Sequence, residues 1–264
     1  MTVYTDLVRY RELFGNLFRR DVQAKYKGSF LGVAWTLANP VLLMAIYLLV
    51  FSVLWRAVQI PHYGLFLLAG LAPWIFFSSS IQNASRSLLD NASLIRKTRF
   101  PRQLVPLSIV ATNLVSLGVM LAVLLVLNFA LLPRVRGTEW LAIPLVALLV
   151  CLVAGLALVV ASLDVLYRDV EHLIAALLLP WFFLTPILYT YATLGAAQTH
   201  PRVVELLHWL NFMAPPIIAI RAPLFYGTLP PLWDTVYLAV EAVVSLALGA
   251  WVFSRLDDRL AVEL

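Results

Sequence analysis

Long runs of apolar residues, separated by short polar stretches, dominate the chain. Six runs approach or exceed the roughly 20 residues that a helix needs to cross a bilayer; they cover about residues 33–55, 64–81, 104–132, 141–163, 173–189 and 236–253. A helix satisfies its own backbone hydrogen bonds, so it is the structure expected for each run. The pattern predicts an all-α integral membrane protein with six transmembrane helices.

A further apolar stretch, residues 203–226, fits a simple span poorly. It carries three ionisable side chains and three prolines, among them Pro215. Proline removes a backbone donor and kinks or ends a helix. We therefore expect a pair of short re-entrant helices on the outer side, between spans five and six. A seventh, kinked span is the alternative.

The residues before the first run have a different pattern. Residues 7–20 place apolar side chains on one broad stripe and mostly charged ones opposite, as in a helix that lies in the headgroup plane. We predict a cytoplasmic amphipathic interface region over residues 1–32, followed by a transmembrane domain over residues 33–264. The helix serves as a membrane anchor, as a packing surface for a partner, or as both.

Residues 90–102 form the longest polar interruption between spans two and three. A short helix is expected to begin near Asn91 or Ser93, which are plausible caps, and to end before Pro101. Three apolar side chains, Leu94, Ile95 and Phe100, lie among four basic ones. Apolar side chains within a polar rim are typical of a docking element, although contact with the membrane explains the same pattern.

Two sets of charges lie close to or inside the apolar runs. In the turn over residues 164–172, Arg168 has Asp164, Asp169 and Glu171 as possible ion-pair partners, and a salt-bridged turn is the simpler interpretation. Glu241 is the carboxylate well inside a predicted span. Ionisable groups at this depth are costly unless paired, and we favour structural pairing over coupling to transport.

Composition and charge agree with a membrane protein. The chain is 62% hydrophobic and 12% charged, with a mean hydropathy of +0.90, whereas soluble domains are roughly 25% charged. An ordinary soluble enzyme is excluded, and the single Cys151 excludes a disulfide scaffold. With both termini cytoplasmic, fourteen of the 19 Lys and Arg residues lie inside. This follows the positive-inside rule and explains the basic charge without nucleic acid.

Several catalytic and nucleotide-binding motifs are missing from the sequence. It contains no phosphate loop of the form G-x-x-x-x-G-K-[ST], no HExxH or CxxC, and no G-x-S-x-G. We therefore predict no catalytic residues, no metal site and no cofactor in this chain. Six spans without an energy source indicate a channel, or a transporter subunit that takes its energy from another protein.

Five segments together resemble the type-2 ABC export permeases that move O-antigen, capsule and teichoic-acid polymers. They are residues 20–40 (RDVQAKYKGSFLGVAWTLANP), 94–101 (LIRKTRFP) followed by Pro106, 167–170 (YRDV), 185–187 (TPI), and 211–215 (NFMAP) with Arg221. They cover nearly the whole chain in the order of that family. One departure is the spacing between Asn211 and Pro215, where the family often has a tighter Asn-Pro pair.

The resemblance implies an assembly and a place in the cell. It implies a homodimer of six-span subunits in the bacterial inner membrane, with two copies of a separate ABC ATPase that bind ATP and Mg on the cytoplasmic side. The cargo is expected to be a polysaccharide, linked to a lipid. Residues 90–101 match a coupling helix that contacts the ATPase, and residues 203–226 match gate helices on the outer side.

The pattern and the resemblance together select four groups of candidate residues. They are Ser93, Leu94, Ile95, Arg96, Lys97, Phe100 and Pro101 for coupling to the ATPase; Arg19, Arg20, Asp21 and Tyr26 for the N-terminal interface; Arg168, Asp169 and Glu171 for the cytoplasmic turn; and Asn211, Pro215 and Arg221 for the outer gate.

Aromatic residues are candidates for the substrate path, because sugars present apolar C–H faces alongside their hydroxyls. The candidates are Trp35, Trp74, Phe76, Phe77, Trp181, Phe182 and Phe183. The competing explanation is the belt of aromatic side chains that membrane proteins place at the lipid–water interface.

Three other functions are compatible with parts of the pattern. The first is an exporter of the same class for a small amphiphile, a drug or haem. The second is an intramembrane transferase acting on lipid-linked sugars, for which Asp164, Asp169, Glu171 and His172 form the one crowded ionisable set. The third is a scaffold subunit that recruits other proteins. An ATPase that co-purifies with the chain distinguishes the exporters from the last two.

Overall fold

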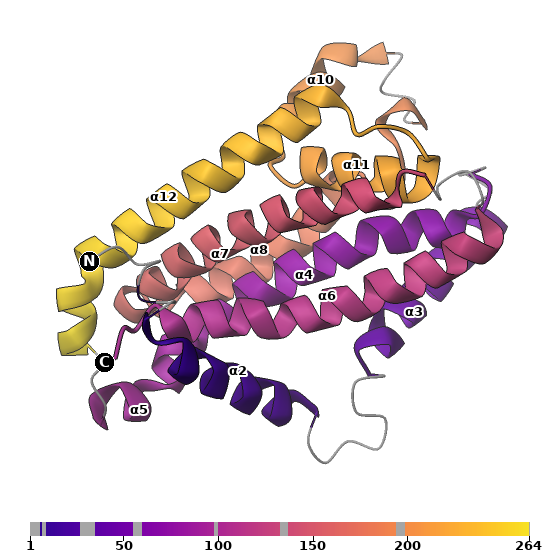
Figure 1. The fold of residues 1–264 in the computed structure, drawn as a ribbon. Coiled ribbons are helices and arrows are strands. Elements are labelled where there is room, and N and C mark those ends of the chain that lie inside the picture. Colours follow the sequence, from indigo (N-terminus) through magenta and orange to yellow (C-terminus); the bar gives the residue numbers. More distant parts are fainter. Residues whose placement is uncertain are drawn as a thin grey trace.

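The computed structural model describes residues 9–26, 35–54, 60–97, 100–132, 137–193 and 199–263, together with Asp6. These ranges contain helices and no strand (Figure 1), which confirms the all-α prediction. The elements are α2 (Arg11–Tyr26), α3 (Trp35–Tyr47) with its π-helical continuation η2 (Leu48–Leu54), α4 (Tyr63–Asp90), α5 (Ala92–Lys97), α6 (Leu104–Leu131), η4 (Glu139–Leu141), α7 (Ala142–Leu166), α8 (Val170–Leu184), η5 (Tyr191–Thr193), α10 (Pro201–Leu210), α11 (Ala214–Arg221), η6 (Ala222–Tyr226) and α12 (Leu232–Glu263).

Four helices in the described ranges are long and apolar enough to cross a bilayer: α4, α6, α7 and α12. The prolines of the segment over residues 201–226 break it into two helices bent by 92°, which form either a broken span or a re-entrant loop. The first and fifth expected spans correspond to shorter apolar helices, Leu37–Phe51 and Val170–Leu184. The chain is therefore a multi-pass membrane protein, while the count of six spans stays a prediction.

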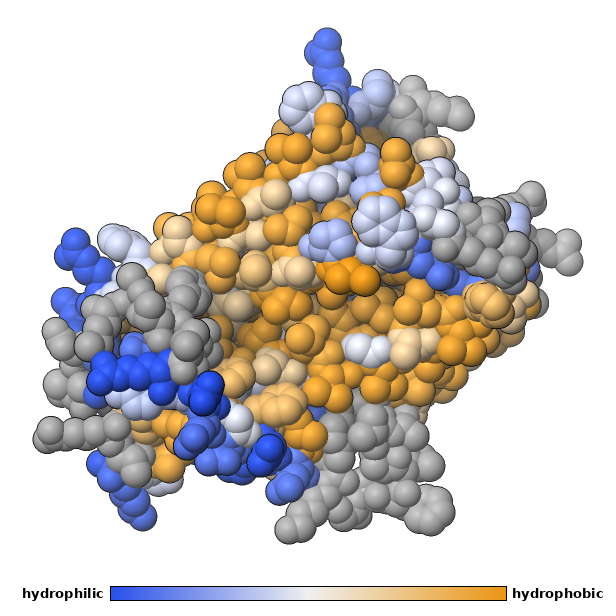
Figure 2. Space-filling model, in the orientation of Figure 1, coloured by the Kyte–Doolittle hydropathy of each residue, from blue (hydrophilic) through white to orange (hydrophobic). Residues whose placement is uncertain are grey.

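Helix α4 lies at the centre of the bundle. Phe66, Leu67 and Leu71 on this helix are fully buried, and α4 packs against α3, α6, α7, α8 and α11. The surrounding helices carry exposed apolar side chains, such as Phe129 on α6 and Val243 on α12. Figure 2 shows that apolar residues cover the middle of the molecule and that hydrophilic residues gather toward its ends. This is the distribution that a hydrocarbon layer requires.

Helices α7 and α12 approach closely at three small residues. A β-carbon at Gly155 would collide with the backbone of Ser245, and one at Gly249 would collide with the backbone of Gly155. The Ser245 hydroxyl also donates to the carbonyl oxygen of Leu152 at 2.7 Å. Small residues allow such contacts between membrane helices, where packing and interhelical hydrogen bonds replace the hydrophobic effect.

The two ends of the bundle differ. Helices α2 and α5 and the last turns of α12 lie at one end, and α10 and α11 lie at the other (Figure 1). We call these the inner end and the outer end. Helix α12 reaches Glu263, beyond the expected end of its span at residue 253, because Leu260 is buried and Leu256 packs at the inner end.

Candidate functional site

An apolar cluster joins five helices at the inner end. This inner cluster consists of Leu17, Leu88, Leu104, Val105, Leu107, Leu158, Ala161, Val165, Phe253 and Leu260. Its members come from α2, α4, α6, α7 and α12. The amphipathic stripe expected near the N-terminus is part of this contact, because Leu17 is buried while Arg19 and Arg20 on the other face are exposed. Helix α2 therefore packs on protein, chiefly on α6.

The three apolar candidates for ATPase docking pack against this inner cluster. Leu94, Ile95 and Phe100 are half-buried there, and their role in docking stays a prediction. A helix as short as α5 depends on burying its apolar face against a neighbour. The coupling candidates that are exposed are Ser93, Arg96 and Lys97, while Pro101 is half-buried at the start of the turn before α6.

Two polar contacts hold the connection between α5 and α6 in place. The guanidinium of Arg102 donates from Nη1 to Oδ1 of Asp257 on α12 at 2.7 Å and to the Asp257 carbonyl oxygen at 2.9 Å. The side chain of Gln103 donates to Oδ2 of Asp6 at 2.8 Å. The connection is thus bonded to α12 and to Asp6 as well as packed near the inner cluster.

Two of the N-terminal interface candidates, Arg20 and Asp21, form an ion pair, and Arg19 is exposed. Oδ2 of Asp21 accepts a hydrogen bond from the Ser108 hydroxyl on α6 at 2.8 Å, and its Oδ1 pairs with Arg20 at 2.7 Å. Further along α2, Lys25 donates to Oδ1 of Asn113 at 3.0 Å. Burial lowers the pKa of Lys25 below its ordinary value. The side chain of Tyr26 lies outside the described residues.

The cytoplasmic turn makes a different ion pair from the expected one. Oε2 of Glu171 lies 3.2 Å from Nε of Arg86 on α4, and the backbone N–H of Glu171 donates to Oδ1 of Asp164 at 2.9 Å. Arg168 and Asp169 are exposed, and no ion pair of Arg168 is found in the described part of the chain. The turn directs Arg168 to solvent, so the predicted pairing of Arg168 with Asp164, Asp169 or Glu171 is wrong.

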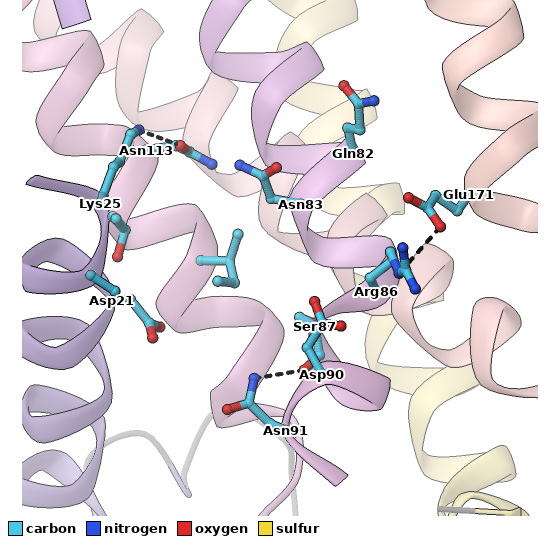
Figure 3. A pocket seen from close by; sticks show the side chains of 13 residues that line it. Asp21, Lys25, Gln82, Asn83, Arg86, Ser87, Asp90, Asn91, Asn113 and Glu171 are labelled. Carbon is cyan, nitrogen blue, oxygen red and sulfur yellow. Dashed lines mark hydrogen bonds and ion pairs between the residues drawn. The ribbon is translucent and has the colours of Figure 1, made fainter. Parts of the chain in front are cut away.

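Between these elements lies a polar groove of about 470 Å³. Figure 3 shows its walls, which α2, α4 and α6 contribute together with the start of α8. Most of its lining side chains are polar: Asp21, Lys25, Gln82, Asn83, Arg86, Ser87, Asp90, Asn91, Thr112, Asn113 and Glu171. The groove therefore gathers polar groups from four helices at the inner end of the bundle.

The aromatic candidates of α4 and α8 form one continuous contact. The ring centroids of Trp74 and Phe182 are 5.7 Å apart, those of Trp74 and Phe77 are 5.5 Å apart, and those of Phe77 and Trp181 are 6.4 Å apart. Phe212, which precedes α11, lies edge-on to Trp181 at 4.5 Å. The two clusters that the sequence separates are thus one aromatic row.

The aromatic candidates of α4 and α8 differ in exposure. Phe76 is fully buried, Trp74, Phe77 and Phe182 are nearly so, and Phe183 is 51% exposed. The side chain of Trp35 lies outside the described residues. A second groove, of about 330 Å³, runs between α3, α4 and α8 and is lined by Tyr47, Trp74, Phe182, Ser78, Ser79 and Gln82, among others. We call it the aromatic groove. The role of these residues in a substrate path stays a prediction.

At the outer end, Asn211 connects α8 to α11. Its Oδ1 accepts from Nε1 of Trp181 at 2.7 Å and from the backbone N–H of Met213 at 3.1 Å. Its Nδ2 donates to the hydroxyl of Thr185 at 3.0 Å. Asn211 is 7% exposed, and a buried amide needs such partners. The nearby Pro215 is buried in the first turn of α11, where a missing N–H does no harm.

Arg221 fixes the segment after α8 against α4. Its guanidinium donates to the carbonyl oxygens of Pro186 at 2.7 Å and Ile187 at 3.0 Å. It also lies 3.9 Å from the ring centroid of Phe66. The side chain is 2% exposed. A charge at this depth is tolerated because carbonyl dipoles and an aromatic face replace part of its hydration.

Three residues of this outer junction are missing from the sequence-based candidates. Gly70 leaves space for the Arg221 guanidinium, the Tyr63 hydroxyl donates to the Leu188 carbonyl oxygen at 2.7 Å, and Asn128 donates to the Leu224 carbonyl oxygen at 2.6 Å. The last contact satisfies a carbonyl near a helix end. Of the three, Asn128 could have been selected from the sequence, because an amide inside an apolar run needs a hydrogen-bond partner.

Comparisons with known proteins give one consistent answer. A family model described as ABC-2 type transporter matches residues 12–225. An O-antigen export system permease protein RfbA from Myxococcus xanthus is 34% identical over 259 residues, which are 97% of this chain and 96% of that protein. Two proteins of the same name from Klebsiella pneumoniae are each 32% identical, over 92% of this chain and 91% of their own.

Proposed function

The chain belongs to the ABC-2 type transporter family, and from this we propose that it is the membrane permease of an ATP-driven exporter of O-antigen polysaccharide. The observation that carries the proposal is the match to O-antigen export permeases along almost the full length of both chains. A match of this extent includes both the inner and the outer end of the bundle. It therefore supports a shared transport role for the whole chain.

The energy is proposed to come from a separate ATPase. The sequence contains no phosphate-loop motif, so we assign ATP and Mg to two copies of a partner subunit on the cytoplasmic side. Helix α5 is the proposed contact with that partner. Its exposed Arg96 and Lys97 supply charge for docking, while its half-buried Leu94 and Ile95 carry movement into the bundle.

The contacts at the inner end support a path for that movement. Displacement of α5 would act on the inner cluster directly and on α12 through Arg102 and Asp257. Packed interfaces tend to switch between discrete arrangements and do not deform continuously. We propose that ATP-driven closure of the ATPase pair rocks α3 and α8 relative to α4, which opens the aromatic groove to the glycan.

The outer end is proposed to act as the gate. The bent pair of helices over residues 201–226 would be a re-entrant segment, held by Asn211 and Arg221. In this arrangement the chain has six spans, both termini are cytoplasmic, two copies form a homodimer in the bacterial inner membrane, and the polysaccharide is linked to a lipid. The positive-inside distribution of Lys and Arg supports this orientation.

Deleting the gene in its own bacterium tests the proposal. We expect O-antigen to disappear from the cell surface and to accumulate in the cytoplasm, both measurable by immunoblotting of fractionated cells with an O-antigen antibody. A plasmid with the wild-type gene should restore surface O-antigen, which controls for effects on neighbouring genes. Unchanged surface O-antigen in the deletion strain would contradict the proposal.

A further inference from the structure

The polar groove at the inner end has the size of a ligand site. Its volume of about 470 Å³ falls within the range of roughly 300–1,000 Å³ that small-molecule sites occupy. It lies between α2, α4, α6 and the start of α8, so its walls are set mainly by packed helices. Helix α4 contributes Gln82, Asn83 and Arg86 to it, with Asn83 turned toward Asn113 on α6 and Arg86 toward Glu171 on α8 (Figure 3).

One wall of the groove carries an amide group whose bonding is incomplete. Oδ1 of Asn113 accepts from Lys25, but its buried Nδ2 has no hydrogen-bond partner among the described residues. Asn113 is 3% exposed. Figure 3 shows Asn113 on α6 and Asn83 on α4 pointing toward one another. A buried donor without an acceptor is costly, and an acceptor supplied by a ligand would remove that cost.

The charges of the groove argue against an anionic ligand. Three carboxylates line it, those of Asp21, Asp90 and Glu171. The two cations already have partners, since Arg86 pairs with Glu171 and Lys25 donates to Asn113. A phosphate group would therefore face repulsion and would have to displace existing contacts.

The remaining polar groups suit hydroxyls. The amides of Gln82 and Asn83 each offer both a donor and an acceptor, and a hydroxyl likewise donates and accepts. Asn91 already donates from Nδ2 to the Ser87 carbonyl oxygen at 2.8 Å and offers its Oδ1. Carboxylates such as Asp90 accept from hydroxyls without a change of charge. Gln82 also lines the aromatic groove, so a ligand held in the polar groove lies next to the proposed path.

We propose that this groove binds an uncharged, hydroxyl-rich sugar unit of the exported glycan on the cytoplasmic side, with Nδ2 of Asn113 donating to a sugar hydroxyl. This inference rests on the proposed function and adds a substrate-entry site to it. The sugar replaces water at the groove, and the aromatic row receives its apolar face as the chain advances.

Binding to the full-length chain in lipid nanodiscs tests the inference. The probe is O-polysaccharide from the same bacterium, freed of lipid and phosphate and fluorescently end-labelled, with inorganic pyrophosphate as competitor. Asn113→Ala removes the Nδ2 donor without adding a charge, while Lys25 keeps the Ser116 hydroxyl as an acceptor, and Asn83→Ala removes the amide on the facing wall. Each is expected to raise Kd about three- to tenfold, the effect of one hydrogen bond.

Two control variants are matched to these changes. Gln23→Ala removes an exposed amide from α2 outside the groove, and Ser254→Ala removes an exposed hydroxyl from the inner half of α12. Both should bind the polysaccharide as the wild type does, and pyrophosphate should not compete. Thermal unfolding of each variant identifies any that fails to fold, and either groove variant is sufficient for the test.

Three results would overturn the inference. The first is wild-type affinity in both folded groove variants. The second is competition by pyrophosphate, which would indicate a lipid-headgroup site. The third is no binding of polysaccharide to the wild-type chain. The export assay separates this failure from failure of the proposed function. A wild-type gene that restores surface O-antigen without measurable binding in nanodiscs contradicts only the sugar site, whereas no role in export contradicts the proposed function.

Discussion

Gly70 on α4 lies directly against Arg221 on α11, so that a β-carbon at position 70 would collide with the guanidinium. Arg221 has no room to retreat, because it is buried and both its Nη atoms donate to backbone carbonyls. Gly70 is thus a condition for the contact that fixes the segment after α8. The absence of a side chain at one position allows a buried charge at another.

Gly70→Ala is therefore expected to destabilise the protein by about 1–3 kcal/mol, as overpacking of a core does, although alanine is the better helix former. Thermal unfolding in detergent measures the effect. Gly118→Ala on α6 is the matched control, because a β-carbon there meets open space. If both variants unfold at the wild-type temperature, the close contact between Gly70 and Arg221 is contradicted.

The hydrogen bonds of Asn211 predict a larger loss of stability for one variant than for another. Asn211→Ala removes the partners of Trp181, Thr185 and Met213 together and should cost roughly 2–3 kcal/mol, because buried donors are left unsatisfied. Trp181→Phe removes one donor, keeps an aromatic ring and should cost about 1 kcal/mol.

Unfolding temperatures of the two variants decide this prediction. Trp233→Phe, on an exposed tryptophan of α12, controls for the loss of an indole ring elsewhere. Equal stability of Asn211→Ala and the wild type would show that the network does not hold the outer junction.

Docking of the ATPase is predicted to depend on the charges of α5. Reversing them with Arg96→Glu and Lys97→Glu should weaken binding of the partner about tenfold at low salt. The difference should narrow near about 1 M salt, where the screening length is only about 3 Å. Aspartate at Leu94 or Ile95 is a poorer test, since both side chains pack against the inner cluster.

Co-purification of the ATPase with the tagged permease measures this effect. Arg202→Glu, which reverses an exposed charge on α10 at the outer end, should leave the complex intact. A complex that survives reversal at positions 96 and 97 would exclude a role for these charges in docking.

Lys25 provides a prediction about pH. Burial disfavours its ammonium form and lowers its pKa from the ordinary value of 10.5. Between the lowered value and 10.5 the unfolded chain binds more protons than the folded chain, so stability increases with pH in that window. Labelling of Lys25 with acetic anhydride, followed by mass spectrometry, should show a lower midpoint in the folded protein than in denaturant. Equal midpoints would contradict the desolvation of the Lys25 ammonium.

The long helices could be predicted because bilayer thickness sets their length. The third apolar run was expected over residues 104–132, and α6 covers Leu104–Leu131. The end of α12 could not be predicted this way. Its last turns are polar along much of their surface, and they are stabilised by Leu260 in the inner cluster and by the pair of Asp257 with Arg102. The inner cluster that these turns pack against is assembled from five helices and exists only in the folded protein.

The candidate site was predictable in part. The sequence singles out Thr185, Asn211 and Arg221 as separate motif positions, and the fold brings them to one junction at the outer end. It does not identify Tyr63 or Gly70 as partners, because a tyrosine and a glycine in an apolar run have no pattern that specifies a distant contact. Likewise, the packing of Leu94 against the inner cluster exists only once α2 and α6 are in place.

Reconstitution of transport tests the central claim most directly. The permease and its co-purified ATPase would be placed in liposomes, and entry of lipid-linked O-polysaccharide into the lumen would be followed by its protection from an added glycosidase. We predict protection that requires ATP, Mg and both proteins, and that disappears when the ATPase is omitted. ATP-independent protection with the permease alone, or none with the full complex, would contradict the account of this chain as a permease driven by a separate ATPase.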